Sequence, residues 1–82
     1  MNEGRLKCDI LKGMFSDERA MVYPPGGRPT ASSFFVPEDQ VSEKDHTVRV
    51  RYFRRGNVLW AVVPAEHQPV IPVNQEDLIP SP

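Results

Sequence analysis

The sequence predicts a small all-β domain with five or six short strands, arranged as an SH3-like barrel, which is the first choice, or as two packed antiparallel sheets. The first observation is the nine prolines in 82 residues, which weigh against long helices because each ring removes a backbone donor and fixes φ. The second is the alternation of polar and apolar residues in short segments between turns, a pattern typical of strands. Either architecture would protect the edges of such strands.

Three short strands are predicted in the first half of the chain, at residues 5–10, 20–23 and 31–36. In the first of them Leu6, Cys8 and Ile10 alternate with charged residues, which indicates one buried face and one wet face. Pro37 follows the third strand and suits the first position of a helical turn. We therefore expect a single helical turn near residues 37–41.

The strongest signal in the chain is a β-hairpin at residues 47–63. Gly56 and Asn57 can supply the positive φ values that a tight two-residue turn needs. With such a turn Phe53 lies opposite Trp60, whereas a four-residue turn would place it opposite Val58. Both turn lengths leave the same residues on each face of the ribbon, because side chains alternate along a strand.

A last strand is predicted at residues 70–73, followed by a helical turn near 74–79 that the Asn74 side chain caps. We expect residues 1–79 to form one domain, since a chain of this size builds one small core. The Pro-rich residues 80–82 are expected to fray. At an offset of 38 positions Glu38-Asp39 aligns with Glu76-Asp77, but few other identities accompany it. We interpret this echo as similar local parts rather than as a duplicated unit.

The two faces of the hairpin differ in chemistry. One face is apolar and is predicted to be core: Val48, Val50, Tyr52, Leu59, Ala61 and Val63. The opposite face mixes arginines with large apolar side chains: Arg49, Arg51, Phe53, Arg55, Val58, Trp60 and Val62. No acidic residue occurs between Asp45 and Glu66, so the local field is expected to be positive. The candidate binding residues are Arg49, Arg51, Phe53, Arg54, Arg55 and Trp60.

These residues predict a non-catalytic interaction module that binds a protein partner or a second copy of itself. Phe53 and Trp60 would be the anchors, since aromatic residues and arginine dominate interface energetics. The alternative is a nucleic-acid-binding domain that uses the same face, with the four arginines of the hairpin on phosphates and the rings stacked on bases. A purely structural interpretation is also open, because arginine stems commonly cover aromatic rings within a fold.

A second aromatic segment lies at Ser33 to Val36. Alternation puts Phe34 and Val36 on one side of the predicted strand and Phe35 on the other. We expect both phenylalanine rings to be in the core, which requires that both faces of this strand be covered.

Composition and motifs exclude several function classes. The net charge of −1 and the pI near 6.1 give no global attraction to nucleic acid or to membranes. The lone Cys8 cannot form an internal disulfide, and Met1 to Phe15 contain no apolar stretch of signal-peptide length. We therefore expect a cytoplasmic protein without a membrane partner.

No catalytic, metal or cofactor site is predicted. His46 and His67 are the only histidines, and neither has a Cys or His at metal-ligand spacing. Cys8 falls inside a predicted strand, where a thiol packs as a small apolar group. Gly26-Gly27 is flanked by prolines and lacks the strand and helix of a phosphate-binding loop. The sequence thus predicts a protein that is not an enzyme.

Overall fold

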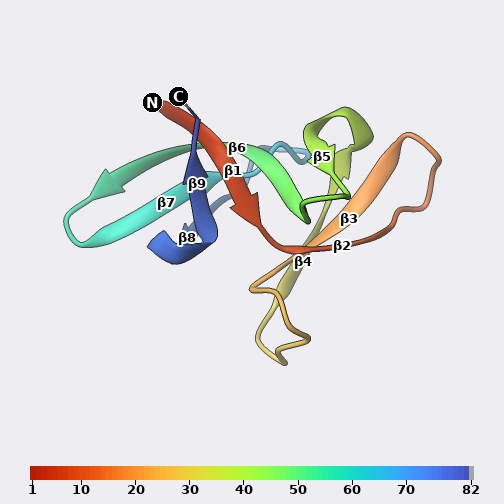
Figure 1. Cartoon of the computed structure of the whole chain (residues 1–82), viewed down its shortest axis with the longest axis horizontal. Coiled ribbons are helices and arrows are strands. Elements are labelled where there is room, and N and C mark those ends of the chain that lie inside the picture. Colours follow the sequence, from red (N-terminus) through yellow and green to blue (C-terminus); the bar gives the residue numbers. More distant parts are fainter. Residues whose placement is uncertain (82) are drawn as a thin grey trace.

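Strands account for 56% of residues 1–81, and the helical content of these residues consists of two short 3-10 turns. The computed structural model describes residues 1–81 (Figure 1). It contains two antiparallel sheets, and no closed barrel forms within these residues. The predicted all-β class is confirmed, and of the two architectures considered the pair of sheets is the one observed.

The larger sheet has six strands: β1 (Asn2–Lys7), β5 (Val41–Ser42), β6 (Thr47–Arg55), β7 (Val58–Val62), β8 (Val70–Val73) and β9 (Leu78–Pro80). Its main path runs β8-β7-β6-β1-β9, and the short β5 pairs with the start of β6. The smaller sheet has the order β2-β3-β4 and consists of β2 (Asp9–Lys12), β3 (Glu18–Tyr23) and β4 (Ser32–Pro37). Figure 1 shows the two sheets side by side, joined where β1 leads into β2.

Both predicted helical turns are confirmed, as η1 (Glu38–Gln40) and η2 (Gln75–Asp77). The capping prediction for Asn74 is wrong, because its side chain makes no cap hydrogen bond. Instead, the backbone carbonyl of Asn74 accepts a bond of 3.0 Å from the N–H of Asp77.

The hairpin of β6 and β7 has the two-residue turn. Phe53 pairs with Trp60 and Arg51 with Val62. Gly56 has φ +60°, whereas Asn57 is not among the residues with positive φ. Only the first turn position is therefore left-handed, which is the type II′ arrangement with glycine first. The expectation that both turn residues adopt positive φ is wrong for Asn57.

One hydrophobic core lies between the two sheets. Its eleven buried residues come from both: Leu6, Cys8, Met21, Tyr23, Val36, Val48, Val50, Leu59, Ala61, Val63 and Leu78. The predicted core face of the hairpin is confirmed, with Tyr52 packed at the edge of this cluster and the other five residues within it. Phe34 packs against the core, but Phe35 is 50% exposed. The expectation for Phe35 is wrong because nothing in residues 1–81 covers the outer side of β4.

The chain is built from two intertwined halves. In the pairing of β1 with β6, Leu6 lies opposite Val48. Leu6 also pairs with Leu78 of β9, and Val48 pairs in the same way with Val41 of β5. The two halves therefore share one pairing pattern around Leu6 and Val48. The last strand of each half pairs with the first strand of the other half.

The offset of 38 that relates Glu38-Asp39 to Glu76-Asp77 does not hold for these pairings, because the loops of the two halves differ in length. Leu6 corresponds to Val48, whereas Val41 corresponds to Leu78 rather than to Ile79. The turn between β2 and β3 is longer than the two-residue turn between β6 and β7. The offset between corresponding residues of the two halves therefore changes after this turn.

The C-terminal residues are also better held than expected. Pro80 belongs to β9 and pairs with Gly4, and the N–H of Ser81 donates a bond of 3.0 Å to the carbonyl of Glu3. The prediction of a frayed end is therefore wrong for these two residues, and Pro82 lies outside the described residues. An added Cβ at Gly4 would lie 2.8 Å from the Ile79 carbonyl oxygen, so glycine permits the close approach of β9.

A tyrosine of the smaller sheet is hydrogen-bonded to the segment that links β8 to β9 of the larger sheet. The Tyr23 hydroxyl donates to Asp77 Oδ2 at 2.7 Å and accepts from the N–H of Asn74 at 2.9 Å. The ring itself belongs to the core. Burial is the main cause that raises the pKa of Tyr23 to about 12. This hydroxyl therefore fixes η2 and β9 relative to β3.

We predict that Tyr23→Phe destabilises the protein by about 1–3 kcal/mol, since it leaves a partly buried N–H and a carboxylate without their partner. The measurement is the urea midpoint at neutral pH. Tyr52→Phe is the matched control, because the Tyr52 hydroxyl has no hydrogen bond among residues 1–81. Equal midpoints for the two variants would show that the hydroxyl does not join the sheets.

Candidate functional site

The candidate site is the face of the six-stranded sheet that points away from the core. Alternation along β6 and β7 places Arg49, Arg51 and Phe53 on it, together with Trp60. Neither Phe53 nor Trp60 is among the residues that form the core cluster or pack against it. Both rings are only half-buried. The predicted separation of the two hairpin faces is thus observed.

The centre of this face is an apolar stripe, which we define as Phe53, Val58, Trp60, Val62, Val70 and Pro72. Trp60 is its middle residue, paired with Phe53 on one side and with Pro72 on the other. Val58 and Val70 are 41% and 48% exposed. Val62 is buried but does not belong to the core cluster. The stripe therefore has a largely covered middle and open ends.

The border of the stripe is basic. We define the basic rim as Arg5, Lys7, Arg49, Arg51 and Arg55. Glu3 is the one acidic residue of β1 or β6 on this face. Half of the ten basic residues of the chain thus lie on one face, although the net charge is −1. The sequence does not indicate that Arg5 and Lys7 belong to this face, because no local pattern predicts that β1 pairs with β6.

Arg54 lies apart from the other candidate residues. It pairs with the buried Leu59, so its side chain leaves the strand on the core side of the ribbon. Its guanidinium donates to Gln75 Oε1 at 3.3 Å. Five of the six candidate residues therefore lie on one face of the sheet: Arg49, Arg51, Phe53, Arg55 and Trp60. Arg54 lies on the opposite face, as the alternation of side chains along β6 implies.

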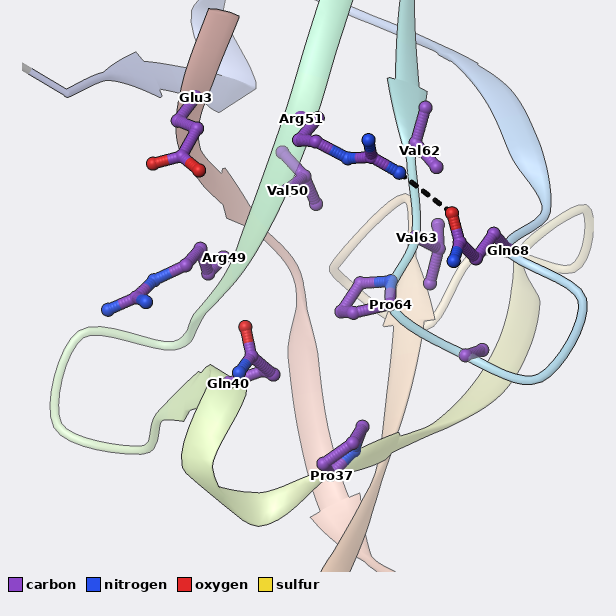
Figure 2. Close-up of a pocket in the computed structure, with 11 residues that line it drawn as sticks. Glu3, Pro37, Gln40, Arg49, Val50, Arg51, Val62, Val63, Pro64 and Gln68 are labelled. Atoms are coloured by element: carbon purple, nitrogen blue, oxygen red, sulfur yellow. Dashed lines mark hydrogen bonds between the residues drawn. The ribbon is translucent and has the colours of Figure 1, made fainter.

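A cleft of about 430 Å³ opens beside Arg49 and Arg51. Figure 2 shows the Arg51 side chain turned toward Gln68 and the Arg49 side chain directed away from it. Arg51 Nη2 donates to Gln68 Oε1 at 2.7 Å. The other residues that line the cleft are Glu3, Pro37, Gln40, Val50, Val62, Val63, Pro64 and Ala65. Val62 also belongs to the apolar stripe, so the cleft and the stripe are continuous.

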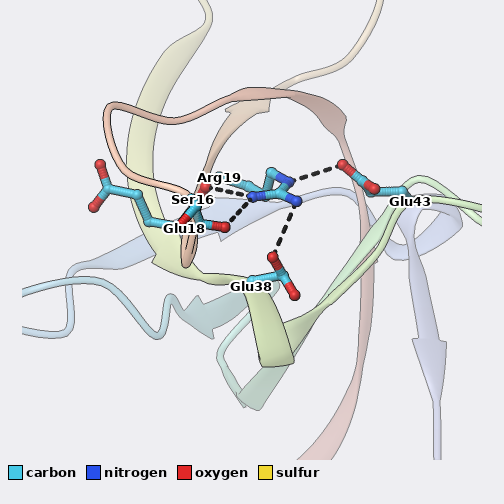
Figure 3. Close-up of polar contacts among 5 residues, drawn as sticks. All are labelled: Ser16, Glu18, Arg19, Glu38 and Glu43. Carbon is cyan, nitrogen blue, oxygen red and sulfur yellow. Dashed lines mark hydrogen bonds and ion pairs between the residues drawn. The ribbon is translucent and has the colours of Figure 1, made fainter.

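The arginines of the cleft differ from Arg19 in their partners. Arg19 donates to Glu43 Oε1 at 2.9 Å and to Glu38 Oε2 at 3.1 Å (Figure 3). It also donates to the backbone carbonyls of Ser16 and Glu18. Arg19 is thus neutralised and connects two loops. No carboxylate within residues 1–81 forms an ion pair with Arg49, Arg51 or Arg55.

The comparisons with known proteins give no relative. No family model, no curated protein and no solved structure matches this chain significantly. The geometry of the face is therefore the basis of the functional proposal.

The histidines do not assemble a site within the described part of the chain. His46 and His67 are both exposed and have positive φ, +56° and +64°. His67 Nε2 lies 3.7 Å from Glu66 Oε1, where both side chains are about nine-tenths exposed. Residues 1–81 contain no group of three or more metal-ligating side chains. They also contain no helix of the length and apolar character that a bilayer crossing requires.

Cys8 lies at the break between β1 and β2, where its N–H donates to the His46 carbonyl at 3.0 Å. The side chain is buried in the core. Burial, with a smaller effect of Asp9, raises the pKa of Cys8 to about 12. The thiolate is the nucleophilic form of cysteine, so this side chain is poorly suited to nucleophilic chemistry near neutral pH.

We predict that Cys8 of the native protein does not react with a disulfide reagent such as DTNB at pH 8, and that it reacts fully in denaturant. The pKa of Cys8 is higher in the folded protein than its value of ~8.5 in the unfolded chain, so the neutral thiol contributes its full stabilisation below that pH. This contribution is lost as the pH rises through about 12. Rapid labelling of the native protein at pH 8 would contradict the burial of the thiol.

Proposed function

We propose that the protein is a non-catalytic interaction module that binds another protein through the apolar stripe and the basic rim. The observation that carries this proposal is the position of Trp60. Its ring lies outside the core, between Phe53 and Pro72, and is half-buried on the outer face of the sheet.

The composition of the face resembles that of protein interfaces. Such interfaces have an apolar centre in which aromatic residues and arginine are enriched, with a polar border. Here the centre combines two rings with Val58, Val70 and other aliphatic groups, and the arginines surround it. Aliphatic side chains offer no stacking surface to a base, and this favours a protein partner over nucleic acid.

The charge of the rim indicates the chemistry of the partner. Five cationic side chains border the stripe, and Glu3 is the acidic residue beside them. A partner surface with apolar and acidic side chains would complement them. Two copies of this face in a symmetric dimer would bring like charges together, which costs free energy. A different protein is therefore favoured over self-association.

We predict that immobilised protein selects, from a displayed library of random linear peptides, sequences rich in aliphatic or aromatic residues together with Asp or Glu. Trp60→Ala should weaken binding of the selected peptides at least about 30-fold, the effect of a 2 kcal/mol hot spot. Binding is measured by fluorescence anisotropy of labelled peptides.

Phe35→Ala is the matched control, because Phe35 is also an exposed aromatic residue but lies on the other sheet. It should leave peptide binding unchanged. Equal effects of Trp60→Ala and Phe35→Ala would contradict the proposal. An unfolded circular dichroism spectrum for Trp60→Ala would show that the indole stabilises the fold rather than an interface.

A second candidate function, nucleic-acid binding, is favoured by one observation: arginines and two rings share one open sheet face. Arginine contacts phosphates and rings stack on bases in many single-strand binders. The sheet has room for this arrangement, since Arg49, Arg51 and Arg55 alternate along the outer side of β6.

For this candidate we predict binding of a labelled 20-nucleotide oligo-dT at about 50 mM salt, with affinity that falls as salt rises. Arg49→Gln should reduce the slope of log affinity against log salt by about 0.7, the value for one single-strand phosphate contact. Arg54→Gln is the control with the same chemistry on the opposite face. No binding at the lowest salt would exclude this function.

A further inference from the structure

The edge strands of the two sheets within residues 1–81 differ in how well they are protected. Strands β8 and β9 are the edges of the main path of the larger sheet, and they contain Pro72 and Pro80. Strand β2, at one edge of the smaller sheet, contains Lys12. Proline and lysine commonly prevent an edge from pairing with another chain. Strand β4 has no charged residue, and its one proline is the last residue of the strand, so this edge is the least protected.

The backbone of β4 offers unpaired hydrogen-bonding groups along this edge. The N–H of Glu38 donates to the Asp17 carbonyl at 2.9 Å, which fixes the phase of the ladder between β3 and β4. Hydrogen-bonded pairs alternate with non-bonded pairs in such a ladder. Phe34 therefore bonds to β3, whereas Ser33 and Phe35 direct their N–H and C=O groups away from it. Both of these residues are exposed.

The open edge is complementary to a second copy of itself. If Phe34 lies opposite Phe34 of the second copy in an antiparallel pair, Ser33 lies opposite Phe35 and Phe35 opposite Ser33. Each of these two pairs exchanges both of its backbone hydrogen bonds, so every outward group of Ser33 and Phe35 finds a partner. A register that pairs Phe35 with itself would set Ser33 opposite Pro37, which has no N–H to donate. The first register is therefore favoured.

This pairing would also cover an exposed ring. On the outer face of the smaller sheet Leu11, Ala20 and Phe35 form one row across the strands. Leu11 and Phe35 are 56% and 50% exposed. In the favoured register the two Phe35 rings are diagonal neighbours across the interface, where aromatic side chains reach each other. The pairing would thus remove both Phe35 rings from water.

The charges at the ends of β4 favour an antiparallel second copy. Arg28 precedes the strand, Glu38 and Asp39 follow it, and all three are exposed. An antiparallel pair brings the basic end of each copy toward the acidic end of the other, which is electrostatically complementary. Neither Arg28 nor Asp39 forms an ion pair within residues 1–81. The apolar stripe differs, because two copies of it would bring like charges together.

We propose that the chain forms a symmetric dimer in which β4 pairs antiparallel with β4 of a second copy. The two smaller sheets would then become one continuous sheet. This inference goes beyond the proposed function and does not depend on it, because β4 belongs to the smaller sheet and the apolar stripe to the larger one.

Sedimentation velocity of the whole chain under reducing conditions tests the dimer. We expect the weight-average sedimentation coefficient to rise from the monomer to the dimer value between about 1 µM and 1 mM, since so small an interface gives weak association. Phe35→Lys should weaken dimerisation about tenfold or more, because it removes the ring contact and sets two cations diagonally across the interface. A chain that stays monomeric over this range, or forms species larger than a dimer, would overturn the proposal.

Phe15→Lys is the matched control variant. It makes the same replacement at a ring that is 66% exposed in the loop between β2 and β3, and it should leave dimerisation unchanged. Equal weakening by Phe15→Lys and Phe35→Lys would overturn the proposal, because the interface would then not be specific to β4.

Hydrogen exchange of the wild-type chain locates the interface without a substitution. The Ser33 and Phe35 amides should exchange more slowly as the protein concentration rises. Val70 is the reference: the Val63 N–H donates to the Pro69 carbonyl at 2.9 Å, so Val70 directs its own N–H outward from the β8 edge. Protection of Val70 rather than of Ser33 and Phe35 would overturn the proposal.

The selected peptides distinguish a second copy from another occupant of the edge. If the chain is monomeric and the Ser33 and Phe35 amides are protected only when a selected peptide is added, the β4 edge belongs to the protein partner. The dimer is then wrong, while the proposed function stands. If the dimer forms through β4 but no peptide requires Trp60, the proposed function is the part that fails.

Discussion

The pairing of β1 with β6 is the interaction on which the rest of the structure depends. Leu6 and Val48 lie opposite each other in this pairing, and both are fully buried. A slip of one residue in β6 would turn Arg49 and Arg51 into the core, where an unpaired guanidinium costs several kcal/mol. The cost of burying those charges thus fixes the register. The same register sets which side chains of β6 and β7 lie on the outer face.

Local features of the chain could be predicted because their causes are local. The hairpin follows from alternation along residues 47–63 and from Gly56, whose left-handed φ suits a two-residue turn. Its inner face is buried as alternation implies. The helical turns follow Pro37 and Asn74, which both have extended backbone conformations. No knowledge of distant residues was needed for any of these elements.

The remaining elements depend on partners far away in the sequence. Strands β5 and β9 are only two and three residues long, so they have no periodicity of their own and exist because β6 and β1 pair with them. Arg5 joins the basic rim only through its pairing with Arg49. The exposure of Phe35 likewise depends on what covers β4, which the alternation in residues 33–36 does not encode. The position of Arg54, by contrast, could be predicted locally, because alternation along β6 alone places it on the core side of the hairpin.

The exchange of last strands between the two halves has a consequence for synthesis on the ribosome. The first half ends with β5, whose partner β6 is made later, and β1 gains β9 only after β6, β7 and β8 have been made. A nascent chain of the first half alone would therefore expose the unpaired backbone of β1 and β5. The larger sheet therefore cannot be completed before residues 78–80 have been made.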